Sequence, residues 1–124
     1  MRLRTLALIL VVLSLSVIAL AADIALEVKV SPNVLVLKAP TNWITIHTDM
    51  PLSAVDQSSL DVAVNGNSVP IALVKADACG QMVLKISQAE VDPYVDPPWA
   101  TFVVTGATNA GDTFEGADTI RVRD

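Results

Sequence analysis

The sequence offers few residues that could carry metal or nucleophilic chemistry. It contains one histidine, His47, and one cysteine, Cys79. A blue-copper site needs two histidines and a cysteine, and a zinc enzyme usually has two or three histidines, so neither site fits. His47 with the nearby Met50 leaves a weak copper site open, and the alternative is a histidine on the surface of a sheet. No Gly-x-Ser-x-Gly motif occurs, so we predict no enzyme, no cofactor, and no catalytic, cofactor-binding or metal-ligating residue.

Three carboxylates near the C-terminus have a regular spacing. Asp112, Glu115 and Asp118 lie at intervals of three residues beside two glycines. Loop carboxylates of this kind can coordinate calcium through oxygen ligands. The alternative is that they are solvated turn residues, because no EF-hand spacing is present. Asp118 could also pair on the surface with Arg121 or Arg123 for little net stability.

The aromatic residues suggest a different kind of site. The chain has two Trp, one Tyr and two Phe, and Trp43, Tyr94 and Trp99 are the ones that could stack on a sugar ring. Tryptophan more often packs in a core. If both tryptophans are buried, the sugar platform is lost.

Cys79 has two interpretations. Since it is the only cysteine, no disulfide can form within the chain. One interpretation is a buried thiol that behaves as a small hydrophobe. The other is a bridge between two chains, which requires the stretch 77–80 to be an exposed turn.

The elements that would position these residues are short β-strands. The stretch 43–48 alternates Ile44 and Ile46 against its other side chains, a period of two that indicates a strand, and we take it as a central strand. Pro51 ends its pairing because proline has no N–H to donate.

Further strand patterns follow at roughly ten-residue spacing, with no sustained helical period after residue 21. We expect a strand over 24–30, and then 34–37 as either a second strand buried on both sides or a continuation of the first. Asn65-Gly66 predicts a hairpin with a type I′ turn, because both central residues need positive φ. We expect the other strands at 60–65, 69–74, 82–87, 99–105 and 118–124, the first three of these forming a meander.

The connections between these strands carry turn residues and prolines. We expect a crossover over 52–59 with one helical turn around 53–56, a turn at 77–80, a long proline-rich connection at 90–98 and a polar turn at 106–116. Seven or eight short strands separated by turns predict an all-β sandwich or barrel. The long connection favours an antiparallel sandwich with a Greek-key crossing.

The N-terminus predicts export. Two arginines precede an apolar run from Leu6 to Leu20, and Ala19-Leu20-Ala21 is a small-x-small cleavage site. We predict that residues 1–21 are a helical signal peptide, with an uncleaved anchor as the alternative. The domain is exported either way and is extracellular, at the cell surface or periplasmic.

Removal of residues 1–21 leaves an acidic domain. Six Lys and Arg then face 13 Asp and Glu, a net charge of −7. Nucleic acid and anionic membranes need a basic footprint, so we expect neither as a partner after signal cleavage. Residues 22–124 are enough for one hydrophobic core and too few for two, so we expect a single domain.

The order of these patterns resembles a known family, the immunoglobulin-like β-sandwich repeats of secreted and cell-surface proteins of bacteria and archaea. The motifs that carry the resemblance are Ser31-Pro32-Asn33, Trp43-Ile44-Thr45-Ile46, Met50-Pro51, Val55-Asp56, Ser59, Val64-Asn65-Gly66, Met82-Val83-Leu84-Lys85, Val104-Thr105-Gly106 and the final stretch 114–122.

The resemblance implies an immunoglobulin-like sandwich over 22–124 and a non-catalytic structural or adhesion-type module. Such repeats often carry several aspartates before the Met-Val-Leu-Lys strand, where this chain has only Asp77. The alternative function is a carbohydrate- or calcium-binding accessory module. We expect a protein or polysaccharide partner, whose identity the sequence does not give.

Overall fold

The structure is a computed structural model that describes residues 22–38 and 42–124. The predicted signal peptide, residues 1–21, lies outside the described residues. No helix among the described residues is long and apolar enough to cross a membrane.

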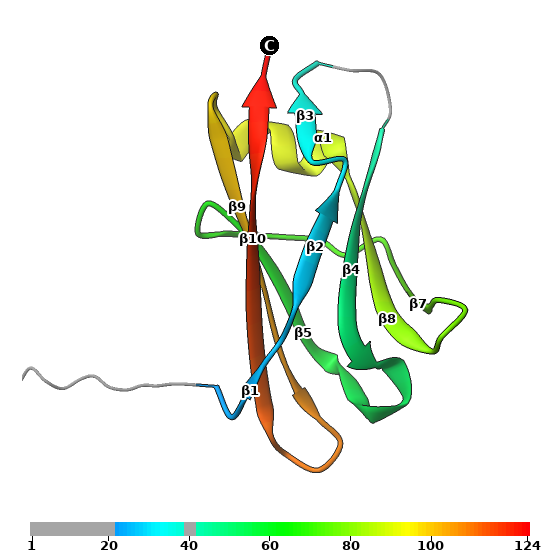
Figure 1. The fold of residues 1–124 in the computed structure, drawn as a ribbon. Helices are drawn as coiled ribbons and strands as arrows, with labels where there is room; N and C mark the ends of the chain where they lie inside the picture. Colours follow the sequence, from blue (N-terminus) through cyan, green and yellow to red (C-terminus); the bar gives the residue numbers. More distant parts are fainter. Residues whose placement is uncertain (1–21, 39–41) are drawn as a thin grey trace, which may run out of the picture.

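The chain folds into two β-sheets packed face to face (Figure 1). One sheet has six strands in the order β1-β10-β9-β5-β6, with β3 also paired to β10, and the other has four in the order β2-β4-β8-β7. The strands are β1 (Ile24–Ala25), β2 (Val28–Ser31), β3 (Val34–Val36), β4 (Trp43–Pro51), β5 (Val55–Val64), β6 (Asn67–Val69), β7 (Leu73–Ala76), β8 (Gln81–Ser87), β9 (Trp99–Thr108) and β10 (Thr113–Arg123).

This strand order is that of an immunoglobulin-like sandwich. From β1 to β5 each strand lies in the other sheet from the one before it, and the chain changes sheet again between β6 and β7 and between β8 and β9. As a result, β2-β4-β8-β7 takes the place of strands ABED and β10-β9-β5 that of GFC. The predicted sandwich is therefore confirmed. The described residues form ten strands rather than seven or eight, because two of the expected strands are each divided between the sheets.

The core lies between the inner faces of the two sheets. The alternation of each strand sends every second side chain inward, and the largest fully buried side chains are Phe102, Phe114, Leu35, Ile44, Ile46, Met82, Leu84 and Ile86. All residues of the buried cluster lie between Leu26 and Val122. The buried side chains of residues 22–38 and 42–124 thus form one hydrophobic core.

The expected central strand is confirmed as β4. It pairs with β2 on one side and β8 on the other, and Pro51 is its last residue. Ile44 and Ile46 are fully buried while Trp43 and His47 are exposed. The pairing with β8 is irregular between His47 and Pro51. There the hydroxyl of the buried Thr48 donates a hydrogen bond of 2.7 Å to the carbonyl of Met82.

The prediction of a single strand over 24–30 is wrong. Residues 24–25 form β1, which pairs with β10, whereas 28–31 form β2, which pairs with β4 in the other sheet. The amide of Leu26 donates to the carbonyl of Glu115 as the chain leaves the first sheet. β3 is a separate strand buried on one face only, since Leu35 is buried and its two neighbours are exposed.

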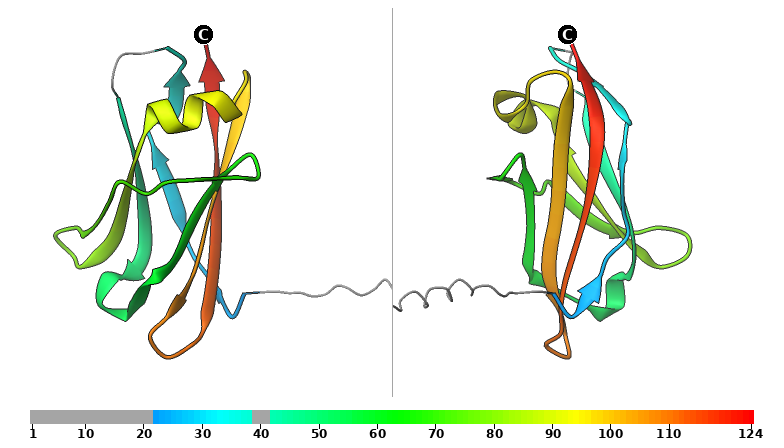
Figure 2. Two further views of the ribbon diagram at one scale, coloured as in Figure 1. Left: turned by 180° about the vertical axis from the view of Figure 1, so that it is seen from behind. Right: turned by 60° about the vertical axis from the view of Figure 1, so that its left-hand side comes forward.

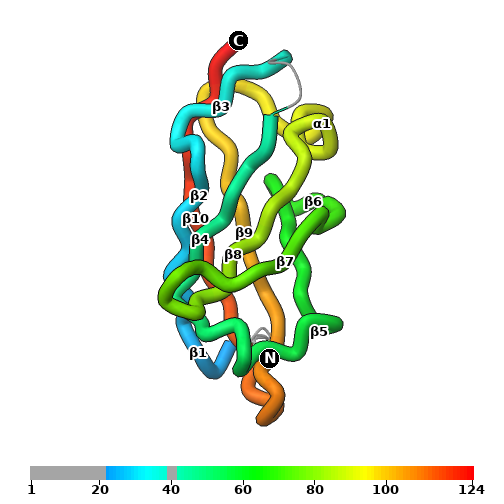
Figure 3. The backbone as a smooth tube through the Cα atoms, turned by 90° about the vertical axis from the view of Figure 1, so that its right-hand side faces the viewer, coloured from blue at the N-terminus to red at the C-terminus, as the bar shows by residue number. Residues whose placement is uncertain are grey.

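The predicted meander is also wrong. The Asn65-Gly66 hairpin joins β5 to β6 as expected, with φ values of 49° and 87°. The expected return strand 69–74 is divided, however, because Pro70 cannot donate to the sheet and the chain crosses to β7 in the other sheet (Figure 3). β5 starts at Val55, directly after a 3-10 turn at Leu52–Ala54, rather than at residue 60.

The two remaining connections differ in length from the prediction. The turn expected over 106–116 is shorter, since β9 extends to Thr108 and β10 begins at Thr113. The proline-rich connection follows α1 (Gln88–Val91) and contains a 3-10 turn (Asp92–Tyr94). These short helices cross one end of the sandwich (Figure 2). The buried Gln88 donates through Nε2 to the carbonyl of Val36, 2.7 Å away.

Candidate binding faces

His47 lies on the outer face of the four-stranded sheet, away from the core. Its neighbours across the sheet are Lys29 on β2 and Val83 on β8. Met50 points to the opposite side of β4 and is 7% exposed, so the structure does not bring the weak copper pair together. Among residues 22–38 and 42–124, no group of three or more His, Cys, Asp or Glu side chains could hold a metal ion.

The three C-terminal carboxylates do not converge. Asp112 lies in the turn before β10, and Glu115 points outward from that strand. Asp118 points toward β2, where its Oδ2 accepts a hydrogen bond of 2.8 Å from the amide of Val30. This carboxylate links the edges of the two sheets, a role that the spacing of the acids did not indicate.

The three candidate aromatic residues are all exposed. Trp43 is 54% exposed, Trp99 56% and Tyr94 44%. Burial therefore does not remove either tryptophan from a binding role. Trp43 points outward from the four-stranded sheet and Trp99 from the six-stranded sheet, so the two cannot form one platform.

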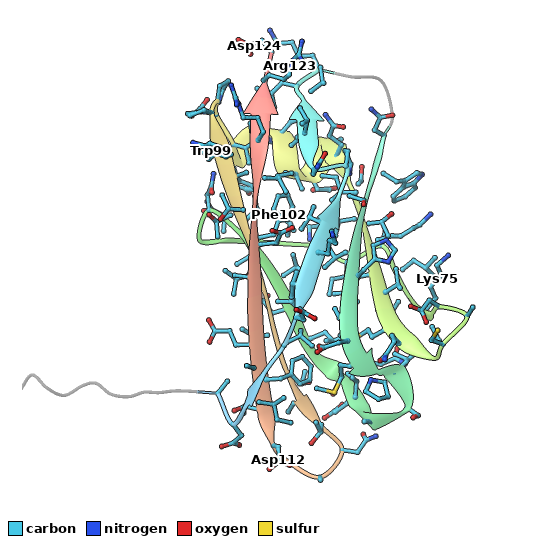
Figure 4. The ribbon with its side chains drawn as sticks, viewed as in Figure 1. Lys75, Trp99, Phe102, Asp112, Arg123 and Asp124 are labelled. Carbon is cyan, nitrogen blue, oxygen red and sulfur yellow. The ribbon has the colours of Figure 1, made fainter. Side chains whose placement is uncertain are left out.

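Trp99 is already in contact with a cation of its own domain. It lies directly opposite Arg121 in the pairing of β9 with β10, and the guanidinium sits 5.5 Å from the centre of the indole ring. Cation–π contacts of this kind favour the pair by about 0.5–1 kcal/mol at exposed sites. Figure 4 shows Trp99 on the opposite side of the sandwich from Lys75 of the four-stranded sheet.

The outer face of the four-stranded sheet gathers most of the lysines. Lys29 on β2, Lys75 on β7 and Lys85 on β8 all point outward, as do His47 and Trp43 on β4. We call these five residues the basic face. The sequence does not indicate the basic face, because its lysines lie as many as 56 positions apart in the chain. They become neighbours only through the order of the strands in the sheet.

A depression of about 510 Å³ adjoins the basic face between β2, β4 and Asp118 of β10. Lys29 and His47 line it together with the acids Glu27, Asp49 and Asp118. Asp49 accepts a hydrogen bond from the amide of Glu27, and Asp118 accepts one from Val30. Two of the three carboxylates are thus engaged in holding the backbone of the chain near β2.

Cys79 is exposed in the turn between β7 and β8. The carboxylate of Asp77 accepts hydrogen bonds from the amides of Cys79 and Gln81, which fixes the turn, and Gly80 has a φ of 84°. The interpretation of Cys79 as a buried thiol is therefore wrong, because the side chain lies in a hydrogen-bonded turn outside both sheets.

No protein-family model and no curated protein sequence matches this chain. Two solved structures are similar to it. One is described as giving insight into host cell surface retention of a 1.5-MDa bacterial ice-binding adhesin, with a TM-score of 0.47 and 19% identity over 79% of this chain. The chain covers 31% of that structure, so it spans about a third of its length.

The second is a bacterial immunoglobulin-like domain from the M. primoryensis ice-binding adhesin, with a TM-score of 0.45 and 18% identity. The match covers 84% of this chain and 100% of that domain. The strand order described above is itself that of an immunoglobulin-like sandwich, and the chain is thus an immunoglobulin-like β-sandwich that resembles bacterial domains of this fold.

Proposed function

We propose that this domain is an exported, non-catalytic module of the adhesion type, which holds a partner against the outer face of one of its sheets. The observation that carries the proposal is the exposure of Trp43 and Trp99, neither of which belongs to the hydrophobic core of the described residues. Removing apolar surface from water stabilises a complex by about 25 cal/mol for each Å² that is buried. Large aromatic side chains left at a surface mark sites where a partner can bury them.

The surroundings of His47 support a non-catalytic role. Its neighbours across the sheet are a lysine and a valine, Lys29 and Val83, rather than a nucleophile and an orienting carboxylate. A serine hydrolase needs a hydrogen-bonded chain of nucleophile, histidine and acid. Lys29 lies directly opposite the imidazole, and two of the three carboxylates that line the depression beside it, Asp49 and Asp118, already accept hydrogen bonds from backbone amides.

A carbohydrate-binding accessory module is the second candidate. The exposure of both tryptophans favours it, because a flat indole ring can stack on the apolar face of a sugar. A calcium-dependent module has less support, since Asp112, Glu115 and Asp118 lie in three different settings within the described residues.

The proposal is tested by adhesion of the domain itself. Beads coated with residues 22–124 are passed under flow over intact bacterial cells and over surfaces coated with cell-wall glycans. We expect retention of these beads, and loss of retention for beads carrying the Trp43→Ala/Trp99→Ala double variant. Equal retention of the double variant, or no retention on any surface, would overturn the adhesion role. Intact-mass measurement of the exported protein checks the predicted removal of residues 1–21.

A further inference from the structure

The charges of the domain are distributed unevenly over its surface. After residue 21 the chain has six Lys and Arg against 13 Asp and Glu. Half of those cations, Lys29, Lys75 and Lys85, nevertheless lie on the basic face. Many of the acids lie instead outside the regular strands, in turns, in connections or in the two short helices, among them Asp23, Asp77, Glu90, Asp92, Asp96 and Asp112.

The lysines of the basic face occupy two adjacent rows across the four strands. One row runs Lys29, His47, Val83 and Lys75 from β2 to β7, and the next runs Ser31, Thr45, Lys85 and Leu73. Neither row contains an acid. The nearest acids lie one outward position beyond the first row, on the side away from Trp43: Glu27 just before β2, Asp49 on β4 and Asp77 just after β7.

Within these two rows no acid lies directly opposite a lysine. Opposite charges across a sheet stabilise it, while like charges on neighbouring strands weaken it. Lys29 lies opposite a histidine and Lys75 opposite a valine, and Lys85 lies between a threonine and a leucine. Lys29 also lines the depression that contains Glu27, Asp49 and Asp118, of which Asp49 and Asp118 accept hydrogen bonds from backbone amides. An anionic ligand laid along the two rows would face all three lysines at once.

The base of this face is apolar. Val83 is 2% exposed although it points outward and does not belong to the core cluster. Neighbouring side chains on the outer face therefore cover it, as the aliphatic parts of lysines commonly do over apolar surface. Leu73, in the same row as Lys85, is 48% exposed. The face thus combines cationic groups with an exposed apolar side chain at its β7 edge.

Trp43 borders the second row of this face. It lies opposite Ser87, and Thr45 and Lys85 form the next outward pair along the same two strands. Unlike Trp99, whose ring already faces Arg121, Trp43 is not engaged in a cation–π contact with the described residues. With 54% of its surface exposed, Trp43 presents its ring one outward pair away from Lys85.

We infer that the basic face binds an acidic polysaccharide, with Trp43 stacked on a sugar ring and Lys29, Lys75 and Lys85 contacting its carboxylate or sulfate groups. This inference rests on the proposed function and assigns it a class of partner. Single-stranded nucleic acid fits less well, since proteins that bind it stack successive bases on several aromatic side chains and this face presents one. The strip of two rows crosses four strands, or about 14 Å at about 4.8 Å per strand, which suits a short oligosaccharide segment.

The test uses polygalacturonate, a uronic acid polymer, as the probe and its methyl-esterified neutral form as the control. We expect residues 22–124 to bind the acidic polymer and not the neutral one, with affinity that falls as salt rises, because exposed charges are screened beyond about 10 Å at 0.1 M salt. We expect the Trp43→Ala and Lys85→Glu variants each to bind about tenfold more weakly or worse. The matched control Arg123→Glu, a charge reversal on the other sheet, retains wild-type affinity.

Three outcomes would overturn the inference, provided that the variants melt at the wild-type temperature. The first is no binding of polygalacturonate or of a sulfated glycan at low salt. The second is equal binding of polyglutamate with no effect of Trp43→Ala, which would show attraction by charge alone. The third is tighter binding of single-stranded DNA than of either glycan. If coated beads still adhere to cells and acidic glycans do not compete, this inference fails while the adhesion role stands.

Discussion

The backbone carbonyl of Leu26 lies directly over the Cα of Gly116, so close that no side chain fits between them. A Cβ added at Gly116 would clash with the Leu26 oxygen and would lie 2.7 Å from Cγ2 of Val28. This contact is where the chain passes from β1 in one sheet to β2 in the other. The absence of a side chain at position 116 lets the first stretch of the domain take part in both sheets.

We expect Gly116→Ala to lower the free energy of unfolding by about 3 kcal/mol, at the upper end of the cost of overpacking a core. The reason is that backbone atoms of Leu26, in addition to the side chain of Val28, must move. Urea denaturation measures the change. The control is Gly106→Ala, whose Cβ would meet only side-chain atoms, with Cζ of Phe114 at 2.6 Å. A cost no greater than that of the control would contradict this account of the crossing.

Thr48→Val tests the hydroxyl that bridges the irregular pairing of β4 with β8. Valine keeps the shape but removes the donor to the carbonyl of Met82, a residue that is fully buried. A buried acceptor left unpaired costs about 1–3 kcal/mol, which lowers the melting temperature by roughly 4–8 °C per kcal/mol. Calorimetry provides the measurement. Thr45→Val, on the outer face of the same strand, should change stability by less than about 0.5 kcal/mol.

Asp118→Ala tests the link between the sheet edges. Its loss leaves the amide of Val30 without the carboxylate that now accepts its hydrogen bond, so we expect a cost of about 1–3 kcal/mol in unfolding free energy. Asp118→Asn keeps an acceptor oxygen and should recover part of this loss. Asp112→Ala, in the exposed turn, serves as the control. Amide exchange of Val30 gives a local readout, and unchanged protection in Asp118→Ala would argue against the link.

Because Cys79 is exposed, we expect its thiol to react with reagents in solution while the domain stays folded. We expect a water-soluble maleimide to label the native domain at the same rate as a short cysteine peptide, within about a factor of ten. Under mild oxidation a dimer should appear on a non-reducing gel and vanish in Cys79→Ser. That variant keeps the amide bonded to Asp77, so its melting temperature should not change. Slow labelling that speeds up only in denaturant would contradict the exposed placement.

Alternation along the strands predicted the inward and outward residues well. Phe102 and Val104 in β9, and Ile120 and Val122 in β10, are buried as expected. Alternation does not indicate which sheet a strand joins, because the inner faces of both sheets bury their apolar residues in the same core. The pattern over 24–30 therefore looks continuous although the chain changes sheet within it.

The features of the candidate faces were harder to predict for a related reason. A tryptophan at the first position of a strand can face the core or the solvent, and only the pairing of Trp43 with Ser87 and of Trp99 with Arg121 places each on an outer face. The lysines of the basic face become neighbours through the strand order of the sheet. Local sequence patterns carry no information on that order.

The parallel pairing of β1 and β3 with β10 determines how the sandwich would respond to tension. The chain enters beside the start of β10, where Asp23 bonds to Thr113, and β10 ends at the opposite end of the sandwich (Figure 1). A pull between Asp23 and Asp124 therefore acts along the strands, over about 36 Å for a strand of this length. The bonds of β1 and β3 to β10 then bear load together in shear instead of opening one after another, so the domain resists extension best along its own strand axis.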